Sequence, residues 1–249
     1  MCVAVVIESK FVNDWFKMII PLVLAFLLSI THFYFESYAH HLKKIDYSFI
    51  SFSSGIFITY IFLTLFPEII KGYELLDNNI LFIALWGFIL FHILEQYVFH
   101  HVSNKRSKLK GIIAVRTSAF FINHVVLGLT LVFFFETGKT MLALFSLVPI
   151  ISHILSSSLI IEHLHHRIRE TTFGKFLSSG SIFLGAILAL FVTIPGVIYY
   201  SLFAFITGVL LYIIIRDTMP SFSDSTPKFF LMGVILYLVL LLIESAILV

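Results

Sequence analysis

Residues 52–67 read FSSGIFITYIFLTLFP and residues 205–220 read FITGVLLYIIIRDTMP, and both stretches fit one pattern. The pattern is Phe, any residue, Ser or Thr, and then Gly, followed by eleven residues and a Pro. Each copy is an apolar run that ends at a proline, so each predicts a membrane helix of the same kind. The copies are five predicted helices apart, and this odd offset gives the second copy the opposite orientation in the membrane. Inverted repeats are typical of secondary transporters, which bind their substrate near the bilayer midplane.

The composition of the whole chain also indicates a membrane protein. Of its 249 residues, 59% are hydrophobic and 12% are charged, whereas about 25% of residues are charged in soluble globular proteins. Such a chain has more apolar surface than a soluble core could bury, and backbone groups in lipid must be satisfied within helices. Cys2 is the single cysteine, which excludes an internal disulfide and a thiolate metal cluster. The net charge of +2 gives no indication of nucleic-acid binding.

Eight apolar segments approach the length of roughly 20 residues that a helix needs to cross the hydrocarbon core of a bilayer. The apolar run before Glu8 and Lys10 is too short for a cleaved signal peptide. The loops between the segments are short, so residues 1–249 are expected to form one all-α transmembrane domain. The predicted helices are 15–35, 47–67, 79–99, 112–135, 141–165, 177–194, 197–216 and 228–248.

The distribution of Lys and Arg predicts the orientation, because basic residues gather in cytoplasmic loops. With eight spans both termini lie on one side, and with the termini outside, 12 of the 16 basic residues fall on the inner side. We therefore expect a multi-pass protein of the cell membrane with both termini outside. The inner set is Lys43, Lys44, Lys105, Arg106, Lys108, Lys110, Arg116, Arg167, Arg169, Lys175, Arg216 and Lys228, and the outer set is Lys10, Lys17, Lys71 and Lys139.

Ionisable side chains within the predicted spans are candidate functional residues, because such groups are costly at membrane depth. The helix predicted at 141–165 carries the largest number of them. His153 and Ser157 share one of its faces, and Glu162 and His166 share a face further inward. The ionisable candidates are His92, Glu95, His124, His153, Glu162, His163, His165, His166 and Glu244, and the polar residues Asn123 and Ser157 accompany them.

Imidazole and carboxylate groups suit Zn²⁺ and Fe²⁺. A helix that carries such groups at two depths could pass a cation from the midplane to the inner mouth. The alternative interpretation is structural: each buried histidine hydrogen-bonds a neighbouring carbonyl or hydroxyl group, and the inner histidines belong to a wet helix end.

Three adjacent histidine pairs lie on the predicted inner side, at 40–41, 100–101 and 165–166. They could form a cytoplasmic patch that collects released cations, or they could be ordinary interfacial polar residues. A third alternative is a membrane di-iron hydroxylase, whose histidine boxes follow spacings such as H-x-x-H-H. The nearest string here is His163-Leu164-His165-His166, which is one residue short of that spacing.

Three local strings are distinctive: Ser54-Gly55 through Pro67-Glu68, Gly87-Phe88 through Glu95 to His100-His101, and Thr207-Gly208 with Tyr212, Asp217 and Pro220. In their order and spacing they resemble helices of the ZIP (zinc/iron permease) family of metal transporters. The resemblance implies eight helices, both termini outside, an inverted repeat of the first three helices against the last three, and a homodimer. No resident cofactor is expected.

The chain departs from the family pattern at the implied metal site. The family's fourth helix carries H-[NS]-x-x-D-G, where this chain has Asn123, His124, Leu127 and Gly128. The fifth helix carries H-E-x-P-H-E or a close variant, where this chain keeps His153 but has Ile154 and Ser156-Ser157-Ser158. Thr64 stands where the family often has a histidine. No carboxylate remains at these positions, and Glu95 is the nearest acidic candidate.

Two functions follow as the main expectations. The first is a ZIP-like carrier that moves a divalent cation, Zn²⁺ or Fe²⁺, towards the cytoplasm by alternating access. In this interpretation His153, Asn123 and His124 are midplane ligands, and Glu162, His163 and His166 form an inner relay. The second is a transport-inactive relative with a structural or regulatory role. An enzyme is not expected.

Overall fold

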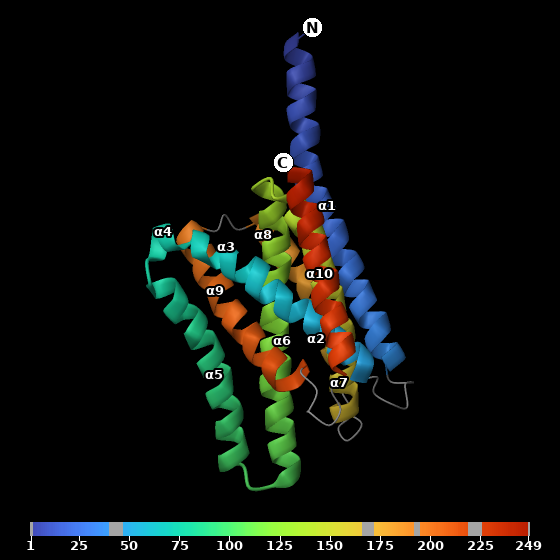
Figure 1. Ribbon diagram of the computed structural model, residues 1–249, viewed down its shortest axis with the longest axis vertical. Helices are drawn as coiled ribbons and strands as arrows, with labels where there is room; N and C mark the ends of the chain where they lie inside the picture. The colour runs from blue at the N-terminus through green and yellow to red at the C-terminus, as the bar shows by residue number, and fades with distance from the viewer. Residues whose placement is uncertain (1, 40–46, 166–171, 192–194, 219–225, 249) are drawn as a thin grey trace.

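The computed structural model describes residues 2–39, 47–165, 172–191, 195–218 and 226–248, and this part of the chain contains helices and no strands. Both chain ends point towards the same end of the helix bundle (Figure 1). The helices are α1 Cys2–Ala39, α2 Tyr47–Tyr60, η1 Ile61–Leu65, α3 Phe66–Lys71, α4 Tyr73–Leu76, α5 Asn79–His101, α6 Lys105–Glu136, α7 Thr140–His165, α8 Thr172–Phe191, α9 Gly196–Ile213, η2 Ile214–Thr218 and α10 Pro227–Leu248.

Seven stretches within the described residues are long and apolar enough to cross a membrane. They comprise the apolar part of α1, the continuous run from α2 to α3, then α5, α6, α7, α9 and α10. In α8 the apolar stretch Ser178–Phe191 is shorter. The chain is therefore a multi-pass helical membrane protein, as the composition predicted, and the eighth crossing stays a prediction.

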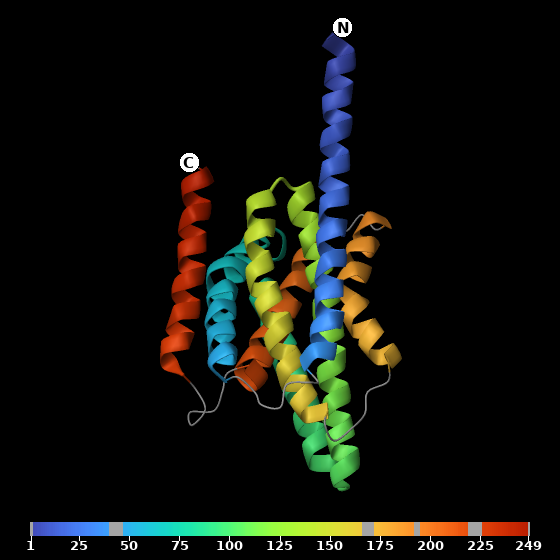
Figure 2. The ribbon, with the colours of Figure 1, turned by 90° about the vertical axis from the view of Figure 1, so that its right-hand side faces the viewer.

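Several predicted helix boundaries are wrong. Helix α1 begins at Cys2 rather than near residue 15, and its first turns project beyond the bundle (Figure 2), although its membrane-crossing stretch Lys17–Phe35 agrees with the predicted span. Helix α6 begins at Lys105 rather than at 112. The basic residues at the start of α6 lower the local hydropathy, but Lys and Arg are good helix formers.

The expectation that each copy of the repeated pattern ends at its proline is wrong for the first copy. The helix changes to the π-helical segment η1 before Pro67 and continues as α3 to Lys71. A proline lacks the backbone N–H that an α-helix would use, and a π turn is one way to accommodate that loss without ending the helix. A second π segment, η2, begins six residues after Gly208, as η1 begins six residues after Gly55.

Three pairs of helices approach each other through glycines on both partners. A Cβ atom on any of the six glycines would lie 1.8–2.1 Å from a backbone oxygen of the facing helix, so each contact is helix backbone on helix backbone. Small residues permit this close approach between membrane helices. The pairs are Gly55 with Gly233 between α2 and α10, Gly87 with Gly208 between α5 and α9, and Gly128 with Gly185 between α6 and α8.

Candidate functional site

Three buried imidazoles from three helices meet inside the bundle. His32 lies on α1, His124 on α6 and His153 on α7. The ring centroids are 5.2 Å apart for His32 and His124 and 6.2 Å apart for His124 and His153. The three side chains are between 0 and 2% exposed. We call these three residues the imidazole cluster.

Most ring nitrogens of the imidazole cluster have no hydrogen-bond partner among the described residues. These are Nδ1 of His32 and both nitrogens of His124 and of His153. The main chain of Ser178 lies near His124 but does not complete a hydrogen bond. Both polar atoms of the buried Asn123 amide also lack a described partner. Buried polar groups in proteins are nearly always paired, so these nitrogens are suited to a ligand.

The spacing of the imidazole cluster is close to the spacing that a metal ion needs, but does not reach it. Zn–N distances put two imidazole centroids on one tetrahedral zinc roughly 5 Å apart. The distance between His32 and His124 meets this value, and the distance between His124 and His153 is longer. Within the described residues no group of three or more His, Cys, Asp and Glu side chains is placed to hold a metal ion. Ion binding would therefore require the α7 imidazole to move closer.

The turn of α7 that follows His153 carries three buried serines. The Ser157 hydroxyl donates to the backbone oxygen of His153 at 2.6 Å, and Ser156 and Ser158 also donate to α7 carbonyls. Their hydroxyl groups make these bonds within their own helix. The serines therefore place polar atoms next to the imidazole cluster without tying α7 to a neighbouring helix.

Sequence reasoning singled out His124 and His153 and missed His32. The structure brings the first two together, with Asn123 buried beside His124 and Ser157 one turn from His153. His32 carries the same signal, an ionisable side chain within an apolar span. No local motif surrounds it, so only the packing of α1 against α6 and α7 reveals its place.

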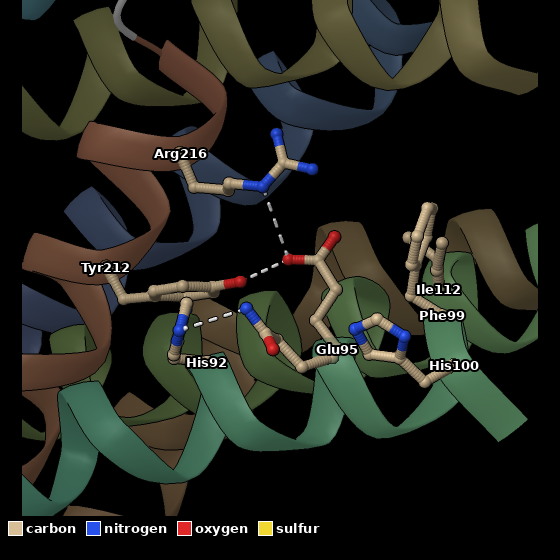
Figure 3. A pocket seen from close by; sticks show the side chains of 8 residues that line it. His92, Glu95, Phe99, His100, Ile112, Tyr212 and Arg216 are labelled. Atoms are coloured by element: carbon tan, nitrogen blue, oxygen red, sulfur yellow. Dashed lines mark hydrogen bonds and ion pairs between the residues drawn. The ribbon is translucent and has the colours of Figure 1, made fainter.

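Glu95, the predicted acidic candidate, lies in a separate pocket (Figure 3). Tyr212 donates a hydrogen bond to its carboxylate, and the Arg216 Nε lies 3.7 Å from the same oxygen. The pocket has a volume of about 290 Å³, and His92 and His100 flank Glu95 along α5. Ile112 of α6 also lines it. Twelve residues of helix separate Ile112 from His124, a rise of roughly 18 Å, so Glu95 is not a ligand of the imidazole cluster.

The other predicted residues are only partly described. Glu162 and His163 lie on the last turns of α7, and nothing is described of their side chains. His166 lies outside the described residues, as do His40 and His41. The predicted inner relay and the patch formed by the three histidine pairs therefore stay predictions.

A second buried carboxylate, which sequence reasoning did not single out as a site, lies near the opposite end of the bundle. Glu68 on α3 is 1% exposed and accepts hydrogen bonds from two lysines, one on each carboxylate oxygen. Lys71 is 2.7 Å away on the same helix, and Lys139 comes from the turn between α6 and α7. This ion-pair cluster links α3 to the α6–α7 turn.

The fold defines a class, the multi-pass all-α membrane protein with a buried cluster of imidazoles. No family model matches the chain, and no curated protein matches it.

Proposed function

We propose that the protein is a membrane carrier for a divalent transition-metal cation, Zn²⁺ or Fe²⁺, moved towards the side that bears the basic loops. The observation that carries the proposal is the imidazole cluster, whose ring nitrogens are buried and lack described partners. Neutral imidazole is a good ligand for zinc, iron and copper and a poor one for magnesium and calcium. His32, His124 and His153 would hold the ion.

The proposal includes a ZIP-like fold of eight helices with an inverted repeat. Two observations support the repeat. The π segments η1 and η2 begin at the same position of the repeated pattern. The glycine contacts are also equivalent under the repeat, which relates the second predicted helix to the seventh and the third to the eighth. The second helix packs on the eighth, and its counterpart, the seventh, packs on the third.

Alternating access is the mechanism that the burial of the site calls for. At 0 to 2% exposure the imidazole cluster is closed to both sides, so an ion can enter or leave only when helices or side chains move. Ser156, Ser157 and Ser158 provide a polar turn along the route from the cluster to the basic end of α7. In this proposal both termini lie outside the cell, and the protein forms a homodimer in the cell membrane.

One observation favours the second candidate, a transport-inactive membrane protein with a structural or regulatory role. The distance between the His124 and His153 ring centroids is too long for both imidazoles to bind one ion, and no acidic side chain among the described residues joins them. A divalent cation in a neutral site keeps its full charge at membrane depth, which is costly. Transport therefore depends on whether the site can close around an ion.

Zinc flux into proteoliposomes that contain the purified protein tests the proposal. Saturable uptake is expected for the natural chain, and uptake is expected to fall to background in His124→Ala, which removes the central imidazole. Thr31→Ala is the matched control because Thr31 precedes His32 on α1, is exposed, and donates its hydroxyl to the Leu27 oxygen of its own helix. Absence of zinc, iron and manganese flux in the natural protein would contradict transport and favour the second candidate.

A further inference from the structure

One phenylalanine contacts every imidazole of the cluster. The ring centroid of Phe120 lies 3.8 Å from that of His124, 5.4 Å from that of His32 and 5.7 Å from that of His153. The side chain is 5% exposed, so it lies inside the bundle with them. No other described side chain makes a ring contact with all three imidazoles.

The surroundings of Phe120 differ from those of the other large buried side chains. It belongs to neither of the two hydrophobic clusters formed by the described residues. Phe57 provides the contrast: its ring lies 4.7 Å from His153, and it is part of the main hydrophobic cluster. Phe120 is therefore a buried core side chain whose ring contacts, among the described residues, are all with the imidazole cluster.

The position of Phe120 along α6 shows that its ring covers the imidazole cluster on the side that faces the beginning of α6. Helix α6 begins at its basic end with Lys105, and Phe120 lies one turn before His124 when counted from that end. Helix α7 follows α6 after a short turn and runs in the opposite direction, as the two views show (Figures 1 and 2). Ser156–Ser158 therefore lie beyond His153 in the direction of the same end. Phe120 and the serine turn are on one side of the imidazole cluster.

We propose that Phe120 is the gate that closes the imidazole cluster towards the basic end of the bundle. Its ring excludes water from the ring nitrogens, and a change of side-chain rotamer, without helix movement, moves the ring off the cluster. The closed position leaves the buried nitrogens unsatisfied, so an ion or water that satisfies them favours the open position. The identity of the passing ion rests on the proposed function, whereas the gate itself rests on the ring contacts.

Cysteine accessibility tests the gate without depending on transport. Replacing Cys2, the single cysteine, by serine gives a background in which Ser152→Cys, at the buried residue next to His153, reports access to the imidazole cluster itself. Labelling with a charged, membrane-impermeant thiol reagent is measured in right-side-out and inverted vesicles. Phe120→Ala is expected to raise the labelling rate at least roughly tenfold, corresponding to an opening shift of about 1.4 kcal/mol. The increase is expected in one vesicle orientation, the one that exposes the basic loops.

Two further variants make the result specific. Phe120→Leu keeps most of the side-chain volume and is expected to give a smaller increase, which provides a result even if Phe120→Ala does not fold. Phe57→Leu is the matched control, since Phe57 contacts His153 from the main core, and it is expected to leave the labelling rate unchanged. Equal acceleration by Phe57→Leu, acceleration from both vesicle faces, or no acceleration in either Phe120 variant overturns the gate.

Zinc added during labelling separates the gate from the proposed function. If the imidazole cluster binds zinc, the ion slows labelling in the Phe120→Ala background. If Phe120→Ala accelerates labelling and zinc has no effect, the gate is upheld and the metal site is not. If zinc is transported but the Phe120 variants do not change labelling, the carrier is upheld and the gate is not.

Discussion

Gly185→Ala is expected to lower the free energy of unfolding by about 3 kcal/mol, the upper part of the usual range for overpacking a close contact. The added Cβ atom would lie 1.9 Å from the backbone oxygen of Val125, where ordinary contact begins near 3.4 Å. The obstacle is the backbone of α6, which cannot rotate away as a side chain could. Helices α6 and α8 would have to separate by more than 1 Å, which disturbs packing beside His124.

Gly180→Ala is the matched control because it makes the same change in the same helix. Beyond its neighbours along α8, no atom of the described residues lies within 4 Å of the position of its added Cβ. Alanine favours a helix over glycine by up to about 1 kcal/mol, so this variant is expected to be neutral or stabilised. Unfolding of both variants in mixed micelles measures the difference. Similar stability of the two would contradict the close backbone contact between α6 and α8.

Lys139→Met is expected to destabilise the protein by about 3 kcal/mol, because it leaves the buried Glu68 carboxylate with the exposed Lys71 as its remaining lysine partner. Lys139 holds one carboxylate oxygen of Glu68, whose side chain is 1% exposed, and is itself 28% exposed. Lys71 holds the other oxygen but is 55% exposed and lies on the same helix. Lys71→Met is therefore expected to cost no more than about 1 kcal/mol.

Glu68→Gln combined with Lys139→Met provides the decisive comparison. Glu68→Gln removes the carboxylate charge that Lys139→Met leaves only partly compensated, so the double variant is expected to recover more than half of the lost stability, measured by unfolding in mixed micelles. If Lys139→Met costs no more than the roughly 1 kcal/mol expected for Lys71→Met, or if Glu68→Gln deepens the loss, the link between α3 and the α6–α7 turn does not stabilise the fold.

Most of the helical architecture could be predicted from the sequence, because a long apolar segment in lipid satisfies its backbone hydrogen bonds by forming a helix. The ends of the helices could not. The start of α6 at Lys105 carries basic residues that a hydropathy pattern excludes, and the continuation past Pro67 depends on a π segment. Hydropathy identifies the segments that lie in lipid. The residues at which a helix begins and ends depend instead on backbone hydrogen bonding, which hydropathy does not report.

The candidate site was only partly predictable for a related reason. His124 and His153 are polar side chains in apolar spans, and that signal is visible without a structure. The depth at which neighbouring helices pack against each other brings His32 next to His124. The same packing keeps Glu95 in a separate pocket, away from the imidazole cluster. Glycines such as Gly128 and Gly185 set that depth by allowing two backbones to touch. The sequence identifies these glycines but not which helix each one faces.

X-ray absorption at the zinc edge of the zinc-loaded protein measures whether His32, His124 and His153 hold one ion. The expected spectrum shows three imidazole nitrogens at about 2.0–2.1 Å from zinc. His32→Ala is expected to reduce that number by one, whereas Thr31→Ala, at the exposed neighbouring residue, leaves it unchanged. Zinc bound by oxygen ligands alone, or an imidazole count that does not change in His32→Ala, would contradict the account.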